Sequence, residues 1–282
     1  MAVPHTKTAL KAMLLARGRR PTRLRGQHFL VDPNLVDAIV RSAGVGRDDC
    51  VLEVGTGSGI LTDKLIGPAG CVVSLEIDRE LLEMTRQARD WPAHAILLEA
   101  DVLRRKHQLE PAVLERWRAE RDARGLGSLL VVSNLPYSVA TPFLANLLWE
   151  GVEARDVVVL VQREAAERFV AVPDTAAYGP MSVAVALLAE ARILRRVPPQ
   201  VFWPPPKVES AVLQLTPRDP ARARELRAAG LQDLLRKGFA HRRKTLRKAF
   251  GAELLERAGL DPGARPAAVE PEGWVRLLRA GP

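Results

Sequence analysis

Largely apolar runs of strand length alternate with helical patterns from about residue 33 to residue 161. These runs occupy residues 51–54, 71–75, 95–98, 129–133 and 157–161. Continuous apolar sequence is typical of strands buried on both faces, whereas a strand with one exposed face alternates. Between the runs, residues 34–43 repeat apolar positions at helical spacing. The pattern predicts an α/β fold, a doubly wound and mostly parallel sheet with helices on both faces.

The pattern changes after a last predicted strand at residues 210–215. Residues 216–220 read Thr-Pro-Arg-Asp-Pro, a turn-forming sequence typical of a linker. Beyond it the chain is rich in Ala, Leu and Arg at helical spacing. We therefore predict a basic N-terminal arm at 1–26, a sheet domain at 27–216 and a small all-α domain at 217–282.

The tetrapeptide Asn134-Leu135-Pro136-Tyr137 directly follows one of the predicted strands. An exocyclic amine on an aromatic base is a weak nucleophile, because its lone pair is delocalised into the ring. The amide oxygen of Asn134 and the carbonyl oxygen of Leu135 can accept the two amine hydrogens and draw the nitrogen toward tetrahedral geometry. Pro136 fixes the backbone that aims them, and Tyr137 offers a face for base stacking. The alternative is an ordinary proline turn with a half-buried tyrosine.

A glycine-rich turn at residues 55–59, Gly-Thr-Gly-Ser-Gly, joins the first predicted strand to a helix. Its glycines, Gly55 and Gly57 among them, allow a sharp turn and close approach of a ligand. Dehydrogenases and flavoproteins use related loops, so the turn alone does not define the ligand. Glu53 precedes it, and a carboxylate there repels pyrophosphate but suits a cationic or zwitterionic ligand such as S-adenosylmethionine. The alternative for Glu53 is a solvated or helix-capping carboxylate.

Two more acids follow successive predicted strands. Glu76 stands 17 residues after Gly59, close to the offset of about 20 residues at which an acid contacts ribose hydroxyls in this architecture. Asp101 follows the strand predicted at 95–98 and is placed to reach the amino group of an adenine. Each acid alone is typical of a protein surface. In this order, ahead of the Asn-Leu-Pro-Tyr tetrapeptide, they indicate a nucleotide cofactor.

These segments resemble the KsgA-type ribosomal RNA adenine dimethyltransferase family over nearly the whole chain. The similar segments are residues 26–30, 53–59, 134–142, 162–168, 178–179, 202–210 and 239–244. The resemblance implies a Rossmann-like class I methyltransferase sheet followed by a small all-α domain. It also implies methyl transfer from S-adenosylmethionine to the 6-amino groups of two adjacent adenosines near the 3′ end of small-subunit (16S) rRNA, each dimethylated.

The same resemblance implies a set of cofactor-binding positions, to which the glycine turn adds Glu53 and Gly57. The positions carried over are His28, Leu30, Gly55, Glu76, Asp101 and Asn134. The chain departs from the family at His28, where Asn is usual, at Thr56, where Pro is common, and at Ser138, often Asn. His28 is therefore expected to contact the cofactor through its backbone or a ring nitrogen. The alternative is a partly exposed loop histidine.

Positive charge is concentrated in two stretches of a chain whose net charge is +9 and whose pI is about 10.1. Residues 1–26 and 236–248 contain many Lys and Arg and no acid. Such clusters neutralise phosphates, although a solvated face or a disordered tail is the usual alternative. The charge-rich segment 104–127 is interpreted as a solvated helix and loop without chemistry. The expected RNA contacts are Phe202, opposite Tyr137 on the target base, and Lys207, Arg242, Arg243 and Lys244.

Three other functions remain open at this point. The first is the antibiotic-resistance type of methyltransferase, which acts on large-subunit rRNA; segments 204–210 and 242–244 favour the small-subunit type. The second is a non-catalytic RNA-binding assembly or transcription factor, which the intact tetrapeptide and glycine turn disfavour. The third is a nicotinamide-dependent dehydrogenase, which Glu53 and the basic termini disfavour.

The remaining features concern compartment and partners. Cys50 and Cys71 are predicted to be buried thiols in a reducing compartment. No run approaches the ~20 apolar residues of a membrane span. The Arg-rich N-terminus overlaps in character with a transit peptide, but the cytoplasm is the expected location. We expect small-subunit rRNA or the pre-30S subunit as partner, a monomer, no membrane, no protein partner and no metal, since the histidines lack ligand spacing.

Overall fold

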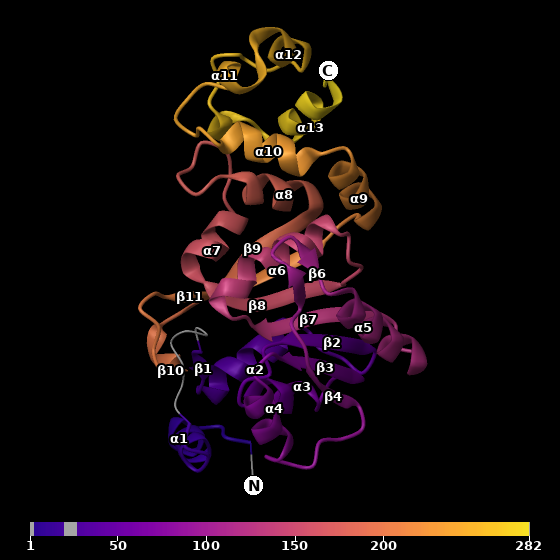
Figure 1. Ribbon diagram of the computed structural model, residues 1–282, viewed down its shortest axis with the longest axis vertical. Helices are drawn as coiled ribbons and strands as arrows, with labels where there is room; N and C mark the ends of the chain where they lie inside the picture. Colours follow the sequence, from indigo (N-terminus) through magenta and orange to yellow (C-terminus); the bar gives the residue numbers. More distant parts are fainter. Residues whose placement is uncertain (1–2, 20–26, 282) are drawn as a thin grey trace. The chain divides into compact units, whose positions relative to one another are not determined.

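The computed structural model describes residues 3–19 and 27–281, and the chain divides into two compact units (Figure 1). Of the described residues, those in Met1–Leu144, Ala154–Arg163 and Ile193–Thr216 form the sheet unit, and those in Ala145–Glu153, Glu164–Arg192 and Pro217–Pro282 form the helical unit. The helical unit is thus larger than the predicted segment 217–282. The reason is that the apolar helix at 180–188 packs against helices of the C-terminal segment.

A seven-stranded sheet forms the centre of the sheet unit, in the order β4-β3-β2-β7-β8-β11-β9. Its strands are β2 (Asp49–Val54), β3 (Cys71–Glu76), β4 (Ala95–Glu99), β7 (Ser128–Asn134), β8 (Asp156–Gln162), β9 (Ala189–Val197) and β11 (Ser210–Pro217). Neighbouring strands from β4 to β8 are parallel, whereas β11 is antiparallel to β8. The predicted mostly parallel sheet is confirmed.

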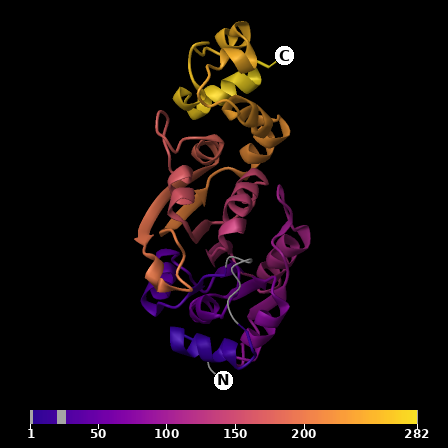
Figure 2. The same cartoon turned by 60° about the vertical axis from the view of Figure 1, so that its left-hand side comes forward.

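Helices cover both faces of this sheet (Figures 1 and 2). They are α2 (Pro33–Ser42), α3 (Ile60–Leu65), α4 (Arg79–Arg86), α5 (Pro111–Ala123) and α6 (Tyr137–Trp149). Helices α2 and α3 share an apolar core with Val51 of β2. On the opposite face, Trp117 of α5 is buried and donates from Nε1 to the carbonyl oxygen of Cys50 at 2.9 Å. Because adjacent strand residues point to opposite faces, the continuous apolar strands serve both layers.

Helix α1 (Lys7–Leu15) is part of the packed sheet unit. Its Leu10 and Leu14 are buried in a cluster with residues of α4. Beyond the helix, the Arg19 guanidinium donates to the two carboxylate oxygens of Asp78 at 3.0 and 2.8 Å. The charge of Arg19 is therefore already paired within the protein. Other predicted members of that arm, Arg20, Arg23, Arg25 and Gly26, lie outside the described residues.

The helical unit is built around buried aromatic side chains. Its helices are α7 (Arg163–Phe169), α8 (Pro180–Leu188), α9 (Pro220–Ala228), α10 (Leu231–Phe239), α11 (Arg247–Phe250), α12 (Ala252–Arg257) and α13 (Pro271–Arg279). Trp274 is fully buried and stacks on Phe239 with ring centroids 5.1 Å apart. Tyr178 is buried beside them, and its hydroxyl donates to the carbonyl oxygen of Val269 at 2.8 Å. Among the described residues, no helix has the length and apolar character needed to cross a membrane.

Candidate functional site

A cavity of about 260 Å³ opens in the sheet unit at the carboxyl ends of β2, β3 and β7. Strand β2 pairs with β7 through their backbones as far as Leu52 and Val131, and beyond this the amide of Val54 donates to Oγ of Ser133 at 2.8 Å. The amide of Gly55 donates to Leu75 of β3 at 2.8 Å, away from β7. The strand order reverses between β2 and β7, and ligands of such sheets bind at this switch point.

The cavity is lined by residues of four segments. They are Gln27, His28, Phe29 and Leu30; Glu53, Gly55, Thr56, Gly57, Ser58, Ile60 and Leu61; Glu76, Ile77 and Leu81; and Asn134, Leu135, Pro136, Tyr137, Ser138 and Val139, joined by Phe202. Every predicted catalytic residue lines the cavity. So does every predicted cofactor-binding residue except Asp101.

Asp101 lies beyond the end of β4 and is exposed. Its carboxylate accepts a hydrogen bond from the amide of Leu103 at 2.9 Å, an arrangement that starts the next turn of the chain. The neighbouring amide of Ala100 donates to the carbonyl oxygen of Glu76 at 3.1 Å, so the segment lies directly beside the cavity wall. Asp101 is thus near the cavity without lining it.

The glycine turn forms one wall of the cavity, and its conformation requires glycine at Gly55 and Gly59. These residues have φ angles of 91° and 82°, a region that residues with a Cβ atom rarely adopt. A Cβ atom at Gly59 would also lie 2.8 Å from Cγ2 of Thr85. The hydroxyl of Thr85 donates to the carbonyl oxygen of Gly57 at 2.7 Å. The turn is therefore fixed from α4 as well as from β2.

Glu53 lies beneath this turn, where its side chain is buried. One carboxyl oxygen accepts hydrogen bonds from Thr62 at 2.5 Å and Ser74 at 2.6 Å, and Ser74 is also 2.6 Å from the hydroxyl of Thr56. Burial raises the pKa of Glu53 to about 8, more than these hydrogen bonds lower it. The carboxyl group is thus mainly neutral at pH 7. Glu53 lines the cavity, and its carboxyl group is bound by the hydroxyls of Thr62 and Ser74.

Glu76 ends β3 with its carboxylate at the cavity. It accepts hydrogen bonds from the amides of Gly57 and Asp78, each at 3.0 Å. Burial raises the pKa of Glu76, opposed by these amides. The next residue, Ile77, is 62% exposed although apolar, and it lines the cavity. An acid followed by an exposed apolar side chain suits a ribose next to a flat ring.

The entry segment forms a short strand, β1 (Phe29–Leu30), which pairs antiparallel with β10 (Phe202–Trp203). His28 precedes it, and its Nδ1 lies 2.7 Å from the carbonyl oxygen of Pro204. The carbonyl oxygen of His28 is 3.5 Å from Nδ2 of Asn134. The ring of His28 is thus engaged by the protein, while its backbone borders the tetrapeptide.

The tetrapeptide forms the opposite wall and leads into α6. With its Nδ2 directed to His28, Asn134 presents its amide oxygen without a hydrogen-bond donor among residues 3–19 and 27–281. The carbonyl oxygen of Leu135 likewise accepts no hydrogen bond within that part of the chain. Tyr137 is half-buried, and its hydroxyl is 2.8 Å from Oγ of Ser210. Burial raises the pKa of Tyr137, so the phenol stays neutral at physiological pH.

The predicted RNA contacts have different environments. Phe202 lines the cavity but is only 3% exposed and packs in the core shared by α2 and α3. Lys207 is exposed in the sheet unit. In the helical unit, Arg242, Arg243 and Lys244 are exposed, and Arg242 donates to the carbonyl oxygen of Thr175 at 3.0 Å.

Cavity residues that the sequence analysis did not identify are mainly apolar. Phe29 and Leu81 line the cavity and also belong to the cluster that includes α1. Ile77 could have been identified from its position directly after Glu76. A ligand that contacts an acid at the end of a strand also contacts the residue next to that acid. Phe29 and Leu81 gave no separate signal, because buried and ligand-contacting apolar residues have the same periodicity.

Comparison with known proteins gives consistent results. A family model described as ribosomal RNA adenine dimethylase matches residues 22–262. A "Ribosomal RNA small subunit methyltransferase A" from Anaeromyxobacter dehalogenans is 38% identical, covering 96% of this chain and 96% of that protein. The protein of the same name from Caldanaerobacter subterraneus subsp. tengcongensis is 37% identical, covering 90% of this chain and 95% of its own length.

Solved structures share the fold. A dimethyladenosine transferase from Plasmodium falciparum has a TM-score of 0.71 and 22% identity, covering 89% of this chain and 96% of that one. The 23S rRNA methyltransferase ErmE has a TM-score of 0.62 and 24% identity, covering 89% of this chain and 98% of that one. At these identities the two structures show a common fold and do not distinguish between substrates.

Proposed function

On the premise that the chain belongs to the ribosomal RNA adenine dimethylase family, we propose that it transfers methyl groups from S-adenosylmethionine to adenosine 6-amino groups of small-subunit rRNA. The expected targets are two adjacent adenosines near the 3′ end, each dimethylated. The observation that carries the proposal is the pair of unengaged acceptors, the Asn134 amide oxygen and the Leu135 carbonyl oxygen, at one wall of the cavity.

The residues of the other wall fit a nucleoside cofactor. The glycine turn allows close approach, Glu76 offers carboxylate oxygens to ribose hydroxyls, and Ile77 offers an apolar face to a ring. S-adenosylmethionine would supply a methyl group on a sulfonium, which is already a strong electrophile. We assign Gly55, Gly57 and Glu76 to this group, with the backbone of His28 and Leu30 at its edge. Asp101 completes the proposed set only if the loop that carries it moves toward the cavity.

The chain itself then has two tasks, to align the acceptor base and to tune its amine. The amide oxygen of Asn134 and the carbonyl oxygen of Leu135 accept the two amine hydrogens and localise the lone pair on nitrogen. Tyr137 stacks on the extruded base, held by its hydrogen bond to Ser210. Alignment of this kind can contribute ~7–11 kcal/mol. No general base is required before transfer, because the methylated amine is acidic and loses its proton to solvent.

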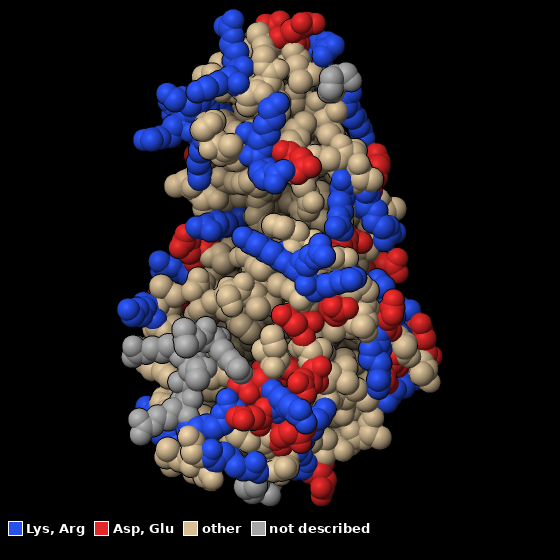
Figure 3. All heavy atoms as spheres, in the orientation of Figure 1, with Lys and Arg blue, Asp and Glu red and all other residues tan. Residues whose placement is uncertain are grey.

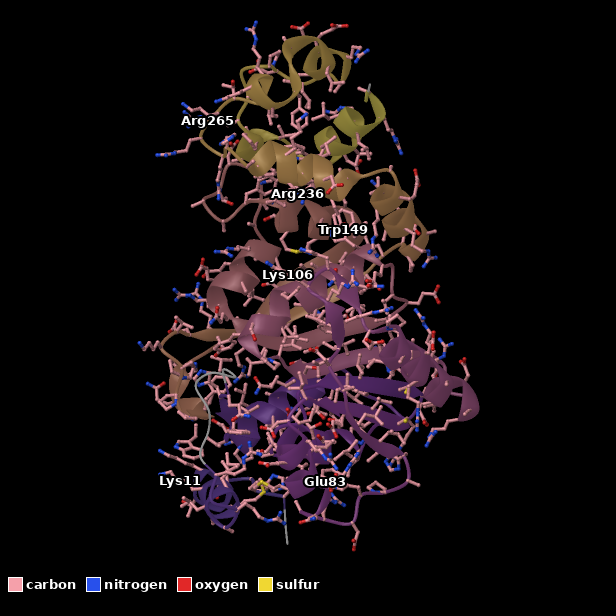
Figure 4. The ribbon with its side chains drawn as sticks, in the orientation of Figure 1. Lys11, Glu83, Lys106, Trp149, Arg236 and Arg265 are labelled. Carbon is pink, nitrogen blue, oxygen red and sulfur yellow. The ribbon has the colours of Figure 1, made fainter. Side chains whose placement is uncertain are left out.

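Recognition of RNA is assigned to basic residues in both units. Lys207 lies in the sheet unit near Phe202, and Arg242, Arg243 and Lys244 form an exposed cluster in the helical unit, whose Arg236 and Arg265 are labelled in Figure 4. We propose small-subunit rRNA, or the pre-30S subunit that contains it, as the partner. A monomer acting in the cytoplasm is part of the same proposal.

A large-subunit target is the second candidate. The similar solved structure ErmE is a 23S rRNA methyltransferase. The curated relatives named here, at 37% and 38% identity, carry small-subunit names instead, and they support the first candidate.

The proposal is tested by incubating the protein with under-methylated small ribosomal subunits and labelled S-adenosylmethionine. Label should enter small-subunit RNA, and mapping should locate it at two adjacent adenosines near the 3′ end. Large ribosomal subunits lacking adenosine methylation are incubated in the same way and serve as the matched control substrate. Label confined to large-subunit RNA would replace the proposal by its second candidate, and absence of transfer to either would contradict an enzymatic function.

A further inference from the structure

A short hairpin rises from the end of β4, where the sequence had suggested only a solvated helix and loop. It consists of β5 (Leu103–Arg105) and β6 (Gln108–Leu109), and we call residues 103–109 the basic hairpin. Its central residues are Arg104, Arg105, Lys106 and His107. Resting on the proposed function, we infer that the basic hairpin binds RNA phosphates beside the adenosine that enters the cavity.

The base of the hairpin is held firmly by the sheet unit. Val102, directly before the hairpin, and Leu109, its last residue, are 2% and 1% exposed. The amide of Glu110 donates to the carbonyl oxygen of Val102 at 2.9 Å, which closes the hairpin. On the other side, the amide of Leu103 donates to Asp101. Buried ends and a closed backbone keep the basic side chains outside the core.

The arginines of the hairpin are available for a partner. Arg104 and Arg105 are exposed, and no acid among residues 3–19 and 27–281 forms an ion pair with either. The situation differs at the neighbouring helix α5, where Arg116 and the C-cap residue Arg124 both pair with Glu120. Cations already paired within the protein gain little from a phosphate, whereas unpaired exposed guanidinium groups bind it well.

The base of the hairpin lies at the same edge of the sheet as the cavity. The hairpin follows Ala100, whose amide donates to Glu76, so its base adjoins the cavity wall at the carboxyl edge of the sheet. Lys and Arg side chains gather over it in Figure 3, and Lys106 is labelled there in Figure 4. An extruded adenosine leaves its flanking phosphates outside a cavity of about 260 Å³. Those phosphates need cations beside its entrance.

The test compares two double variants with equal loss of charge. Arg104→Gln with Arg105→Gln removes the hairpin arginines. Arg47→Gln with Arg118→Gln is the matched control, since both residues are exposed and Arg47 lies before β2, at the opposite edge of the sheet. Exposed substitutions of this kind leave the fold intact, which thermal melting of each variant verifies.

The hairpin variant should raise KM for under-methylated small subunits by about 5- to 20-fold, with kcat little changed. The slope of log affinity against log salt should fall by roughly 1.5, as expected for two lost phosphate contacts. Affinity for S-adenosylmethionine should stay within about 2-fold, and Arg104→Lys with Arg105→Lys should restore most RNA affinity.

Equal KM values and salt slopes for the hairpin and control variants would overturn the inference. So would a fall in S-adenosylmethionine affinity without a change in salt slope, since the hairpin would then only support the cavity wall. Failure of the unaltered protein to methylate small subunits would instead contradict the proposed function. Direct RNA binding by the variants would still decide the role of the hairpin in that case.

Discussion

The two walls of the cavity differ in how their polar groups are satisfied. On the wall formed by the glycine turn, Glu53 binds two hydroxyl groups and Glu76 binds two backbone amides. On the wall formed by the tetrapeptide, the amide oxygen of Asn134 and the carbonyl oxygen of Leu135 bind no donor among the described residues.

The two walls therefore have different roles, because the first fixes the shape of the cavity and the second provides groups for the reaction. Internal hydrogen bonds hold the first wall in one conformation before a ligand enters, so that binding costs little reorganisation. The second wall keeps acceptors open, and a ligand amine with two hydrogens is the natural partner for them. Substitutions on the first wall should therefore affect stability and cofactor affinity, whereas those on the second should affect turnover.

The largest effect is expected for Asn134→Ala. Loss of the amide oxygen removes one of two acceptors for the amine, and kcat should fall by ~1,000-fold, equivalent to about 4 kcal/mol. Affinity for S-adenosylmethionine, measured by calorimetry, should change by less than about 10-fold. If turnover stayed near normal, the open acceptors would have no role in the chemistry.

The next effect concerns Glu53→Ala. The substitution leaves the buried hydroxyl of Thr62 without its partner and should lower the free energy of unfolding by about 2–4 kcal/mol. Glu53→Gln keeps the shape and the acceptor oxygen and serves as the matched control, with a loss under about 1 kcal/mol. Denaturant unfolding at pH 6 measures the free energy of unfolding of both variants. Equal stability of the Ala and Gln variants would show that the hydrogen bonds do not hold the turn.

Glu53 also predicts a pH dependence of stability. Its pKa rises from an ordinary value of 4.5 to about 8 on folding, so the folded protein binds the proton more tightly. The stabilisation is complete below pH 4.5 and is lost as pH rises through 8. Between pH 5 and 9 the unaltered protein should therefore lose roughly 2–5 kcal/mol relative to Glu53→Gln. A constant difference over this range would mean that Glu53 is ionised throughout.

Gly55→Ala should have a moderate effect on the first wall. The φ angle of 91° disfavours any residue with a Cβ atom, and the added methyl would lie 3.4 Å from Cδ of Pro136. We expect a loss of about 1–2 kcal/mol in stability and a ~10-fold loss of cofactor affinity. Gly44→Ala is the control, with a φ angle of 56° and open space around its Cβ position. Similar cofactor affinity in both variants would contradict a ligand at Gly55.

The smallest effect is expected for Tyr137→Phe, which keeps the ring and removes its hydrogen bond to Ser210. The ring should lose orientation, and kcat should fall by about 3- to 10-fold, in line with a single hydrogen bond of about 1 kcal/mol. Tyr137→Ala removes the stacking face and should reduce RNA methylation by ~100-fold. Single-turnover kinetics measures the rate of methyl transfer in the Phe and Ala variants and so distinguishes the loss of the hydrogen bond from the loss of the stacking face. An unaffected Ala variant would argue against base stacking at this position.

Much of the fold follows from local pattern. Continuous apolar runs identified the strands β2, β3, β7 and β8, because a strand buried on both faces consists mainly of apolar residues. The hairpin at 103–109 was not predicted, because short strands with basic residues have the composition of a solvated loop. The helical unit also extends beyond the predicted segment 217–282, since the sequence of an apolar helix does not reveal which neighbouring helices cover it.

The sequence by itself determined which chemical groups the cavity contains, since glycines, acids and the tetrapeptide are each tied to the end of a strand. Only the tertiary structure decided their state. Burial raises the pKa of Glu53, whose carboxyl group binds two hydroxyl groups, and the packing of four chain segments leaves the cavity between the two walls. Whether a group is paired, charged or open depends on neighbours that are distant in the chain, and the spacing of residues does not encode them.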